Sequence, residues 1–387
     1  MALPLPLLEE HTASRQLGAL WQNLHRSGYV PAARGPVLML ALPPAWENRF
    51  QTLLYSRAAA HGVAVAGVRH PDDLIHISWP GPVVLHAHWF ASVFTSALSE
   101  ADAMGRLHKM IAAIDTFAER TGAQLLWSAH NVFPHGNRFP KTNLALRRWI
   151  FERFEMLHVM DDSHVDVLEQ AFGRSAPPVF CVPHMTYHGA VPDSLDKATA
   201  RAHFGIARDA FVFGAFGSLQ QYKNLDGFLD VFTAIADAQP ARPLAALVGG
   251  VPGDVDFARV LATRFGDDPR ITLIPRMIED AEIQYMHHGA DVMVMPYRDT
   301  LNSGAAMMAA TFERPFVMPD TIAAKAMVPL GARLYDPAAS DGLQRALESC
   351  LAEGDAPVMP QTAPAALATR APHYISEAFM TAVLDRL

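Results

Sequence analysis

The chain has 387 residues, of which 50% are hydrophobic and 18% charged, with a formal net charge of −8 and a mean hydropathy of +0.10. This length exceeds one ordinary domain, and the composition excludes a disordered chain and a general nucleic-acid binder. The two cysteines, Cys181 and Cys350, are far apart, which excludes a disulfide scaffold and a cysteine zinc site. No signal peptide and no apolar run of about 18 residues is recognisable, so we expect a cytoplasmic protein.

Short β-branched runs alternate with helical patterns, which is the rhythm of a parallel sheet. A polar stretch at 193–209 separates two such series. We therefore predict an α/β protein with two Rossmann-like, doubly wound domains, residues 1–190 and 191–371, followed by an amphipathic helix at 372–387. In this architecture ligands bind at the carboxyl ends of the strands, so we expect the site in a cleft between the two sheets. The first series of runs is 36–42, 63–68, 82–88, 123–130, 156–160 and 178–182, and the second is 211–217, 243–250, 270–275, 291–296 and 314–320.

Histidines end two of the strands predicted in the first domain. His86 and His88 lie in PVVLHAHWF, and His130, Asn131 and His135 lie in QLLWSAHNVFPHG. Alternation along a strand sends His86 and His88 to the same side. No carboxylate accompanies these histidines at ligand spacing, which favours hydrogen bonding to a polyhydroxylated ligand over a metal site. His86 is interpreted as a buried structural histidine, whereas His130, at the strand end, is a candidate functional residue.

Two loops at the same predicted edge carry carboxylates. Glu47 and Asn48 follow the first strand, and Asp161 and Asp162 follow the strand MLHVM. Either loop would place a carboxylate where it could remove a proton from an acceptor hydroxyl. Capping of the next helix by Asp162 or Ser163 is the competing interpretation of the second pair.

The segment FPKTNLALRRWIFERF (139–154) combines a compact group of cations with aromatic residues. Such a helix could rest on an anionic membrane surface. The competing interpretation is a surface helix whose aromatic residues pack inward. We therefore keep peripheral membrane contact as one hypothesis for this helix.

Two motifs in the second half of the chain suit a diphosphate. In FGSLQQYKN (216–224), a glycine turn at Gly217 and Ser218 is followed by Lys223. In PYRDTLNSGAAMMAATFERP (296–315), a polar loop leads from Tyr297 to a helix that Asn302 or Ser303 can cap, with Gly304 in its first turn. Bare amides and the positive end of a helix favour an anion. The competing interpretations are a solvated lysine and a plain cap.

A third strand end carries Arg276 and Met277, whose main chain could meet a nucleotide base. The chain contains no GxGxxG, GxxxxGK[ST], HExxH or GxSxG pattern. Nicotinamide dehydrogenases, P-loop enzymes, zincins and the usual serine hydrolases therefore lose support.

These motifs resemble those of the GT-B glycosyltransferases, which have two Rossmann-like domains and use nucleotide-sugar donors without a metal ion. FGSLQQYKN looks like their donor-phosphate turn, with Ser218 in the place of the usual arginine. The segment 291–319 looks like the region that normally carries Glu-x7-Glu, but Thr300 and Met308 stand where we align the two glutamates. HAHW, WSAHNVFPH and LNSG together are more similar to a bacterial exopolysaccharide-assembly branch that includes the xanthan-type β-mannosyltransferases.

The resemblance implies transfer of mannose from GDP-mannose, with inversion, to a polyprenyl-diphosphate-linked oligosaccharide at the inner face of the plasma membrane. It also implies no cofactor besides the nucleotide-sugar substrate, and a C-terminal helix that packs back on the N-terminal domain. The departures leave open a retaining or inverting transferase for UDP-glucose or UDP-glucuronate, a non-catalytic nucleotide- or sugar-binding protein, and a UDP-sugar 2-epimerase.

We assign roles to the candidate residues on this basis. His130 contacts the sugar or deprotonates the acceptor, and Glu47 and Asp161 are rival bases. The donor-binding candidates are Gly217, Ser218, Lys223, Arg276, Met277, Tyr297, Asn302, Ser303 and Gly304, and the acceptor-binding candidates are Asn48, His88, Asn131 and His135.

Overall fold

The computed structural model describes residues 13–387 except 27, 30–34, 46–47, 298–299 and 355–356. The chain divides into two compact units, here called unit 1 and unit 2. Unit 1 comprises Met1–Met185 with Pro372–Leu387, and unit 2 comprises Thr186–Ala371. Each unit is built around one parallel sheet, so the predicted α/β class with two Rossmann-like domains is confirmed.

The sheet of unit 1 has six parallel strands in the order β2-β1-β3-β4-β5-β6. Its central strands are buried along their whole length, as expected for a parallel sheet covered on both faces. All six correspond to apolar runs of the sequence. They are β1 (Val37–Leu42), β2 (Val63–Gly67), β3 (Val83–Ala87), β4 (Gln124–Ser128), β5 (Met156–Val159) and β6 (Val179–Cys181).

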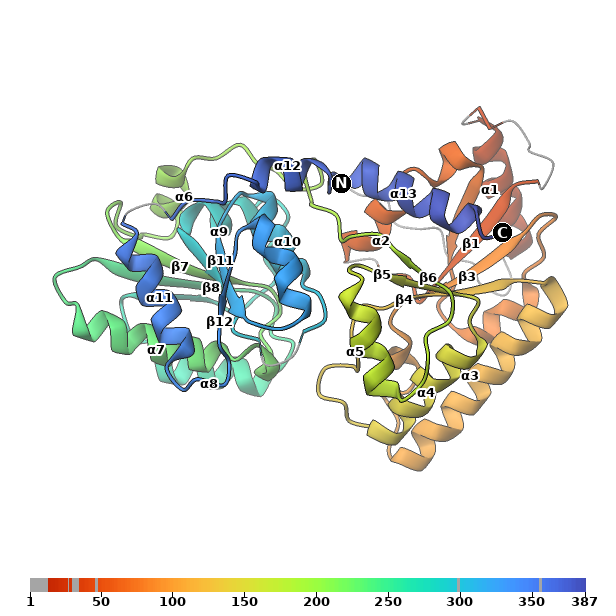
Figure 1. Ribbon diagram of the computed structural model, residues 1–387, viewed down its shortest axis with the longest axis horizontal. Helices are drawn as coiled ribbons and strands as arrows, with labels where there is room; N and C mark the ends of the chain where they lie inside the picture. Colours follow the sequence, from red (N-terminus) through yellow and green to blue (C-terminus); the bar gives the residue numbers. More distant parts are fainter. Residues whose placement is uncertain (1–12, 27, 30–34, 46–47, 298–299, 355–356) are drawn as a thin grey trace. The chain divides into compact units, whose positions relative to one another are not determined.

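Helices cover both faces of this sheet (Figure 1). One face carries α3 (Glu100–Thr121), α4 (Pro140–Arg153) and α5 (Ser163–Phe172). The other carries α1 (Ala13–Arg26), α2 (Arg49–Leu54) and the C-terminal α13 (Pro372–Leu384). Three short 3-10 helices complete the unit: η1 (Ala58–His61), η2 (Pro71–His76) and η3 (Phe90–Val93).

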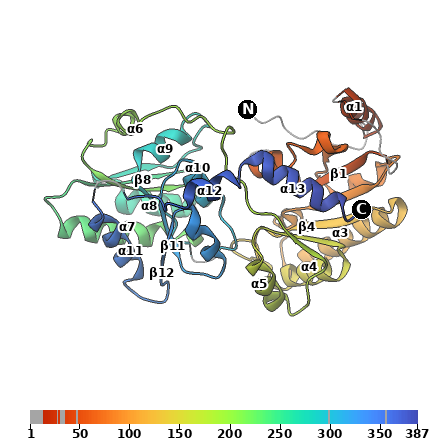
Figure 2. The same ribbon diagram turned by 45° about the horizontal axis from the view of Figure 1, so that its top comes forward.

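Helix α13 belongs to the core of unit 1 although it ends the chain (Figure 2). Phe379 and Met380 are fully buried and join a cluster with Phe50 and Leu54 of α2. The buried Ser376 hydroxyl donates a hydrogen bond to the Leu54 carbonyl at 2.7 Å. It accepts one from the amide of Arg57, which follows α2, at 2.9 Å.

The sheet of unit 2 also has six parallel strands, in the order β12-β11-β10-β7-β8-β9. Five of them correspond to predicted strands. The sixth, β12 (Ala332–Tyr335), is an edge strand whose four residues carry no recognisable apolar alternation. The others are β7 (Phe211–Phe216), β8 (Leu244–Gly249), β9 (Ile271–Ile274), β10 (Val292–Val294) and β11 (Phe316–Pro319).

The helices of unit 2 again lie on both faces (Figure 1). On one side are α6 (Lys197–His203), α9 (Ile283–Gly289) and α10 (Gly304–Thr311), and on the other are α7 (Leu225–Ala238), α8 (Val255–Phe265) and α11 (Gly342–Ala352). A short α12 (Ala363–Ala368) precedes α13 in the sequence. The unit also contains η4 (Gln221–Lys223) and η5 (Ala323–Leu330). None of the helices in the described part of the chain is long and apolar enough to cross a bilayer.

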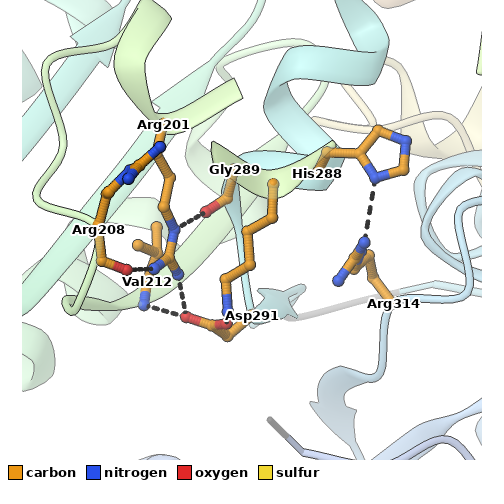
Figure 3. Close-up of polar contacts among 8 residues, drawn as sticks. Arg201, Arg208, Val212, His288, Gly289, Asp291 and Arg314 are labelled. Carbon is orange, nitrogen blue, oxygen red and sulfur yellow. Dashed lines mark hydrogen bonds and ion pairs between the residues drawn. The ribbon is translucent and has the colours of Figure 1, made fainter. Parts of the chain in front are cut away.

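A buried carboxylate holds α6 to the sheet of unit 2 (Figure 3). Asp291, which precedes β10, accepts hydrogen bonds from Arg201 Nη2 at 2.6 Å and from the Val212 amide at 2.7 Å, and it pairs with Lys197. The Arg201 guanidinium also donates to the Gly289 and Arg208 carbonyls, so both charges are satisfied away from water. This pairing accounts for two charged side chains in the core.

Replacement of Asp291 by asparagine would leave both cations facing an uncharged amide. We expect Asp291→Asn to destabilise unit 2 by about 3–5 kcal/mol, as when one partner of a buried ion pair is removed. Urea unfolding followed by circular dichroism would measure the change, with tryptophan fluorescence as the separate signal of unit 1, because all six tryptophans lie in that unit. Asp230→Asn, which breaks the half-exposed pair with Arg264, is the matched control and should cost less than about 1 kcal/mol. Equal losses in the two variants would contradict the expectation.

Candidate functional site

The strand orders single out one position in each sheet. In unit 1, the connections from β1 and β3 leave on opposite faces, and in unit 2 the same is true of β7 and β10. Ligands of doubly wound sheets bind outside the carboxyl ends of the strands at such switch points. His88 follows β3, and Gly217 and Tyr297 follow β7 and β10, so these three candidate residues lie at the switch points.

The turn after β7 depends on two glycines. Gly217 has φ of +117°, and its amide donates to the Gly249 carbonyl at 3.0 Å. A Cβ on Gly250 would lie 1.9 Å from the Gly217 carbonyl oxygen, so the two chain segments can approach only without side chains there. A Cβ on Gly217 would lie 2.8 Å from Lys223 Nζ. The turn therefore directs its bare backbone toward the lysine.

Lys223 is a buried ammonium without a carboxylate partner in the described part of the chain. The residue is 7% exposed, and Nζ lies 5.4 Å from the ring centroid of Tyr297. Burial lowers the pKa of Lys223 to about 8, because the charged form is poorly solvated. A buried cation that the protein does not pair is a position at which an anionic ligand supplies the missing charge.

Tyr297 connects Lys223 to the start of α10. Its buried phenol hydrogen-bonds to Ser303, and burial raises the pKa of Tyr297. Ser303 caps α10 as predicted, since its Oγ accepts a hydrogen bond from the Ala306 amide at 3.2 Å. Gly304 opens the first turn, whose amides have no partner within the helix. Lys223, Tyr297 and Ser303 thus bring together two motifs that lie 80 residues apart in the sequence.

A pocket of about 390 Å³ adjoins Tyr297 at the carboxyl ends of β10, β11 and β12. Thr300, the residue aligned with a family glutamate, lines it and donates a hydrogen bond to the Asn302 carbonyl at 2.7 Å. Most of the residues that line this pocket were not predicted from the sequence, because they come from strand ends without a charged or histidine motif. Among the missed residues are Asn224, Gly227, Pro319, Thr321, Tyr335 and Ser340.

Other donor-binding candidates have partners of their own. The Arg276 guanidinium donates two 2.7 Å hydrogen bonds to Glu282 and one of 2.9 Å to the Met277 carbonyl. Arg276 is therefore held by a carboxylate, and the Met277 carbonyl is already used. Ser218 Oγ accepts a hydrogen bond from Gln220 at 3.1 Å.

In unit 1, the structure brings His88 and His130 together. His88 Nδ1 lies 3.0 Å from His130 Nε2. Trp89 stacks on the His130 ring with centroids 4.1 Å apart, and Phe50 meets it edge-on at 4.9 Å. Burial, followed by the nearness of His88, other histidines and Arg147, holds the pKa of His130 well below its ordinary value. His130 is therefore neutral at pH 7 and able to accept a hydrogen bond.

The remaining candidates of unit 1 lie apart from this pair of rings or have structural contacts. Asn48 caps α2, its Oδ1 accepting from the Phe50 amide at 3.0 Å, and His135 is exposed in the loop after β4. Asn131 follows His130 and is half-buried. Asp161 Oδ1 accepts from the Ser163 amide at 3.0 Å and from its hydroxyl, so Asp161 stabilises the start of α5 in place of the predicted caps. Glu47 lies outside the described residues.

The cationic helix α4 does not present its cations on one face. Arg147 is 5% exposed and its guanidinium lies over the Trp127 ring, and Arg153 pairs with Asp115 and Glu155. The cations that lie close together in the sequence are therefore separated in the structure, because helical geometry turns Arg147 into the core. Lys141 and Arg148 are the exposed cations of this helix. Among the described residues, no group of three or more His, Cys, Asp or Glu side chains is placed to hold a metal ion.

Comparison with known proteins identifies the class to which this architecture belongs. No protein-family model matches the chain. The fold is shared by the Anabaena HepE structure in complex with UDP-glucose (TM-score 0.64, 16% identity, covering 90% of this chain and 100% of that one). It is also shared by sucrose-phosphate synthase from Thermosynechococcus elongatus (TM-score 0.61, 14% identity, covering 90% and 94%). The fold is thus that of the GT-B glycosyltransferases.

A sequence relative makes the assignment more specific. The GDP-mannose:glycolipid 4-beta-D-mannosyltransferase of Xanthomonas campestris pv. campestris is 24% identical over 289 residues, covering 72% of this chain and 67% of the relative. The prediction of a GT-B glycosyltransferase that resembles the xanthan-type enzymes is confirmed, and with it the enzyme class.

The burial of Lys223 predicts that nucleotide binding depends on pH. Below pH 8 the ammonium is already charged, whereas above pH 8 binding of a diphosphate must also take up a proton. The dissociation constant of GDP or UDP should therefore rise above pH 8, by up to about tenfold per pH unit. Titration calorimetry between pH 7 and 9 measures this slope, and Lys223→Gln should abolish it. An equal slope in both proteins would show that another group titrates.

Proposed function

We propose that the protein transfers a hexose from a nucleoside diphosphate sugar to a hydroxyl of a lipid-linked glycan. The observation that carries this proposal is the buried Lys223 ammonium at the switch point of unit 2, which no carboxylate of the described residues pairs, next to Tyr297 and the amides that open α10. Unit 2 would hold the donor, and unit 1 would bind the acceptor. Mannose from GDP-mannose is the donor we favour, because the relative's name states that donor.

The chemistry follows from where charge develops. When the bond between the anomeric carbon and the diphosphate breaks, negative charge builds on the departing oxygen. Lys223 and the amides around Gly217, Ser303 and Gly304 would stabilise that charge from fixed positions, which is worth more in a buried site than in water. His130, neutral and buried, would accept a hydrogen bond from a substrate hydroxyl. Direct displacement by the acceptor hydroxyl would invert the anomeric configuration.

The acceptor is proposed to be a polyprenyl-diphosphate-linked oligosaccharide at the inner face of the plasma membrane. The support is that the relative is described as acting on a glycolipid. Lys141 and Arg148 of α4 are exposed cations that could meet anionic lipid, although two such charges supply only about 1 kcal/mol each. Membrane contact would then depend mainly on the glycolipid itself.

A UDP-sugar is the second candidate donor. The observation in its favour is that the Anabaena HepE structure, which shares this fold, is described as a complex with UDP-glucose. The relative and the HepE structure are described with different nucleotides, so the base must be tested directly.

Nucleotide selectivity distinguishes the two donors. We expect GDP, at about 100 times its dissociation constant, to stabilise the native protein by roughly 2.7 kcal/mol and to raise its melting temperature, whereas UDP, ADP, dTDP and CMP should do less. A thermal-shift titration measures these changes. A shift produced by UDP alone would replace the donor by a UDP-sugar. The absence of a shift with every nucleotide would overturn the donor site.

Loss of the Lys223 charge should reduce turnover. We expect Lys223→Ala to lower kcat by tenfold or more, because the departing diphosphate loses its nearest cation (about 1.4 kcal/mol per factor of ten). The assay measures sugar transfer to a short-chain polyprenyl-diphosphate glycan. Lys325→Ala, which removes an exposed lysine of the same unit, is the control and should keep wild-type turnover. Wild-type turnover in the Lys223 variant would contradict the assignment.

A further inference from the structure

A continuous chain of hydrogen bonds runs beneath His130 through the sheet of unit 1. It joins four histidine rings through one phenol and one serine hydroxyl, and it ends on a backbone carbonyl. Every residue that contributes a side chain is buried. The links, here called the relay, are His130 Nε2 to His88 Nδ1 (3.0 Å), His88 Nε2 to Tyr55 Oη (2.7 Å), Tyr55 Oη to His86 Nδ1 (2.7 Å), His86 Nε2 to Ser128 Oγ (2.7 Å), Ser128 Oγ to His158 Nδ1 (2.7 Å) and His158 Nε2 to the Val182 carbonyl (2.9 Å).

The carbonyl at the far end determines the first half of the relay. The Val182 oxygen can only accept, so His158 must carry its proton on Nε2. A neutral His158 then has a lone pair on Nδ1, which requires the Ser128 hydroxyl to donate to it. The single hydrogen of Ser128 is thereby used, so its oxygen accepts from Nε2–H of His86. The position of the hydrogen at each link therefore determines its position at the next link.

The same logic continues to His130. Because His86 carries its proton on Nε2, its Nδ1 accepts from the Tyr55 hydroxyl. The Tyr55 oxygen in turn accepts from Nε2–H of His88, whose Nδ1 accepts from Nε2–H of His130. His130 is left with an unprotonated Nδ1. One carbonyl thus determines the tautomers of four rings, and all six links point in one direction.

The surroundings keep every member of the relay neutral. Burial is the main reason that the pKa values of His86, His88 and His130 lie well below the ordinary value, and it lowers the pKa of His158 to about 4. Burial also raises the pKa of Tyr55. Phe379 of α13 stacks on His86 with ring centroids 5.2 Å apart, so an apolar ring covers the middle of the relay.

The relay cannot carry a proton out of the site. A proton that entered at His130 could shift along five links and convert His158 to an imidazolium. It would stop there, because a peptide carbonyl does not take up a proton, and the charge would be buried beside Phe180 and Phe379. The arrangement is therefore suited to fixing which nitrogen of His130 accepts, and not to proton export.

We propose that Tyr55 and Ser128 are positioning residues that fix the tautomer of His130, so that its Nδ1 can only accept a hydrogen bond. A correctly held tautomer orients the ring toward a hydroxyl donor and costs no rearrangement when the ligand binds. The identity of that donor, a hydroxyl of the sugar or of the acceptor, rests on the proposed function. The tautomer itself does not, since it follows from contacts within unit 1.

The tautomers can be read directly in the wild-type protein. Long-range proton–nitrogen correlations of protein labelled with ¹⁵N-histidine distinguish protonated from unprotonated ring nitrogens, and correlations to each Cβ assign the rings. At pH 7 we expect His86, His88, His130 and His158 to carry hydrogen on Nε2 alone. A hydrogen on Nδ1 of any of the four would overturn the proposal. This measurement needs no substrate, so it stands whether or not sugar transfer is observed.

Two variants test the positioning role. Tyr55→Phe keeps the aromatic packing and removes the central hydroxyl, and Ser128→Ala interrupts the relay nearer its end. In each we expect a second tautomer of His130 to appear and kcat for sugar transfer to fall by about tenfold or more, while the GDP dissociation constant of unit 2 is unchanged. An unchanged single tautomer in a folded variant of either kind would contradict the role.

Ser376→Ala is the matched control. It removes a buried hydroxyl of unit 1 that also makes two hydrogen bonds, one of them to the Leu54 carbonyl, but it is not part of the relay. The four tautomers and kcat should be unchanged. Loss of the single tautomer in this control would show that the effect of the other variants is general loosening of the core. Failure of nucleotide binding, by contrast, would overturn the proposed function and leave the tautomer result intact.

Discussion

The order of strands in the two parallel sheets is the constraint on which the candidate sites depend. Connections that leave neighbouring strands on opposite faces open a space at their carboxyl ends, and only there can loops from distant parts of the chain converge. In unit 2 this brings the turn after β7 next to the loop after β10. In unit 1 His88 lies at the switch point, and the pairing of β3 with β4 places it beside His130 under Trp89. The order of the strands thus determines where each candidate site lies, whichever side chains occupy that position.

Within that frame, the buried polar groups of the protein fall into two kinds. Asp291 satisfies its charge internally, with Arg201, Lys197 and a backbone amide around it. Lys223 is buried to a similar extent, yet no carboxylate of the described residues answers it. The fold pairs the buried charge of Asp291 completely, so packing alone does not explain why Lys223 lacks a carboxylate partner among the described residues. The difference between the two residues is therefore the physical argument for a ligand at Lys223.

The sequence alone predicted the fold well, because periodicity and strand composition are local properties. Eleven of the twelve strands correspond to apolar runs, and β12 was missed because a four-residue edge strand carries too little pattern. The Ser303 cap was also predictable from its immediate neighbours. Tyr55 was not, because its partners, His86 and His88, lie at the end of β3, 31 and 33 residues away, and nothing around Tyr55 in the sequence marks a site. Nor did the sequence show that Arg147 is buried, since that depends on its packing against Trp127. The pairing of Arg276 with Glu282 is local, but it depends on the path of an irregular loop that carries no pattern.

The relay indicates the order in which the diphosphate departs and the acceptor hydroxyl loses its proton in the proposed transfer reaction. A histidine that burial keeps neutral and whose relay ends on a carbonyl is a weak base at neutral pH, because efficient proton removal needs a pKa close to that pH. Asp161, the rival that the structure describes, already accepts from the amide and hydroxyl of Ser163. Little driving force for early deprotonation is therefore present in the described part of unit 1. Departure of the diphosphate, helped by Lys223 and the start of α10, would then precede proton loss, and His130 would contribute by holding a hydroxyl in the orientation for attack.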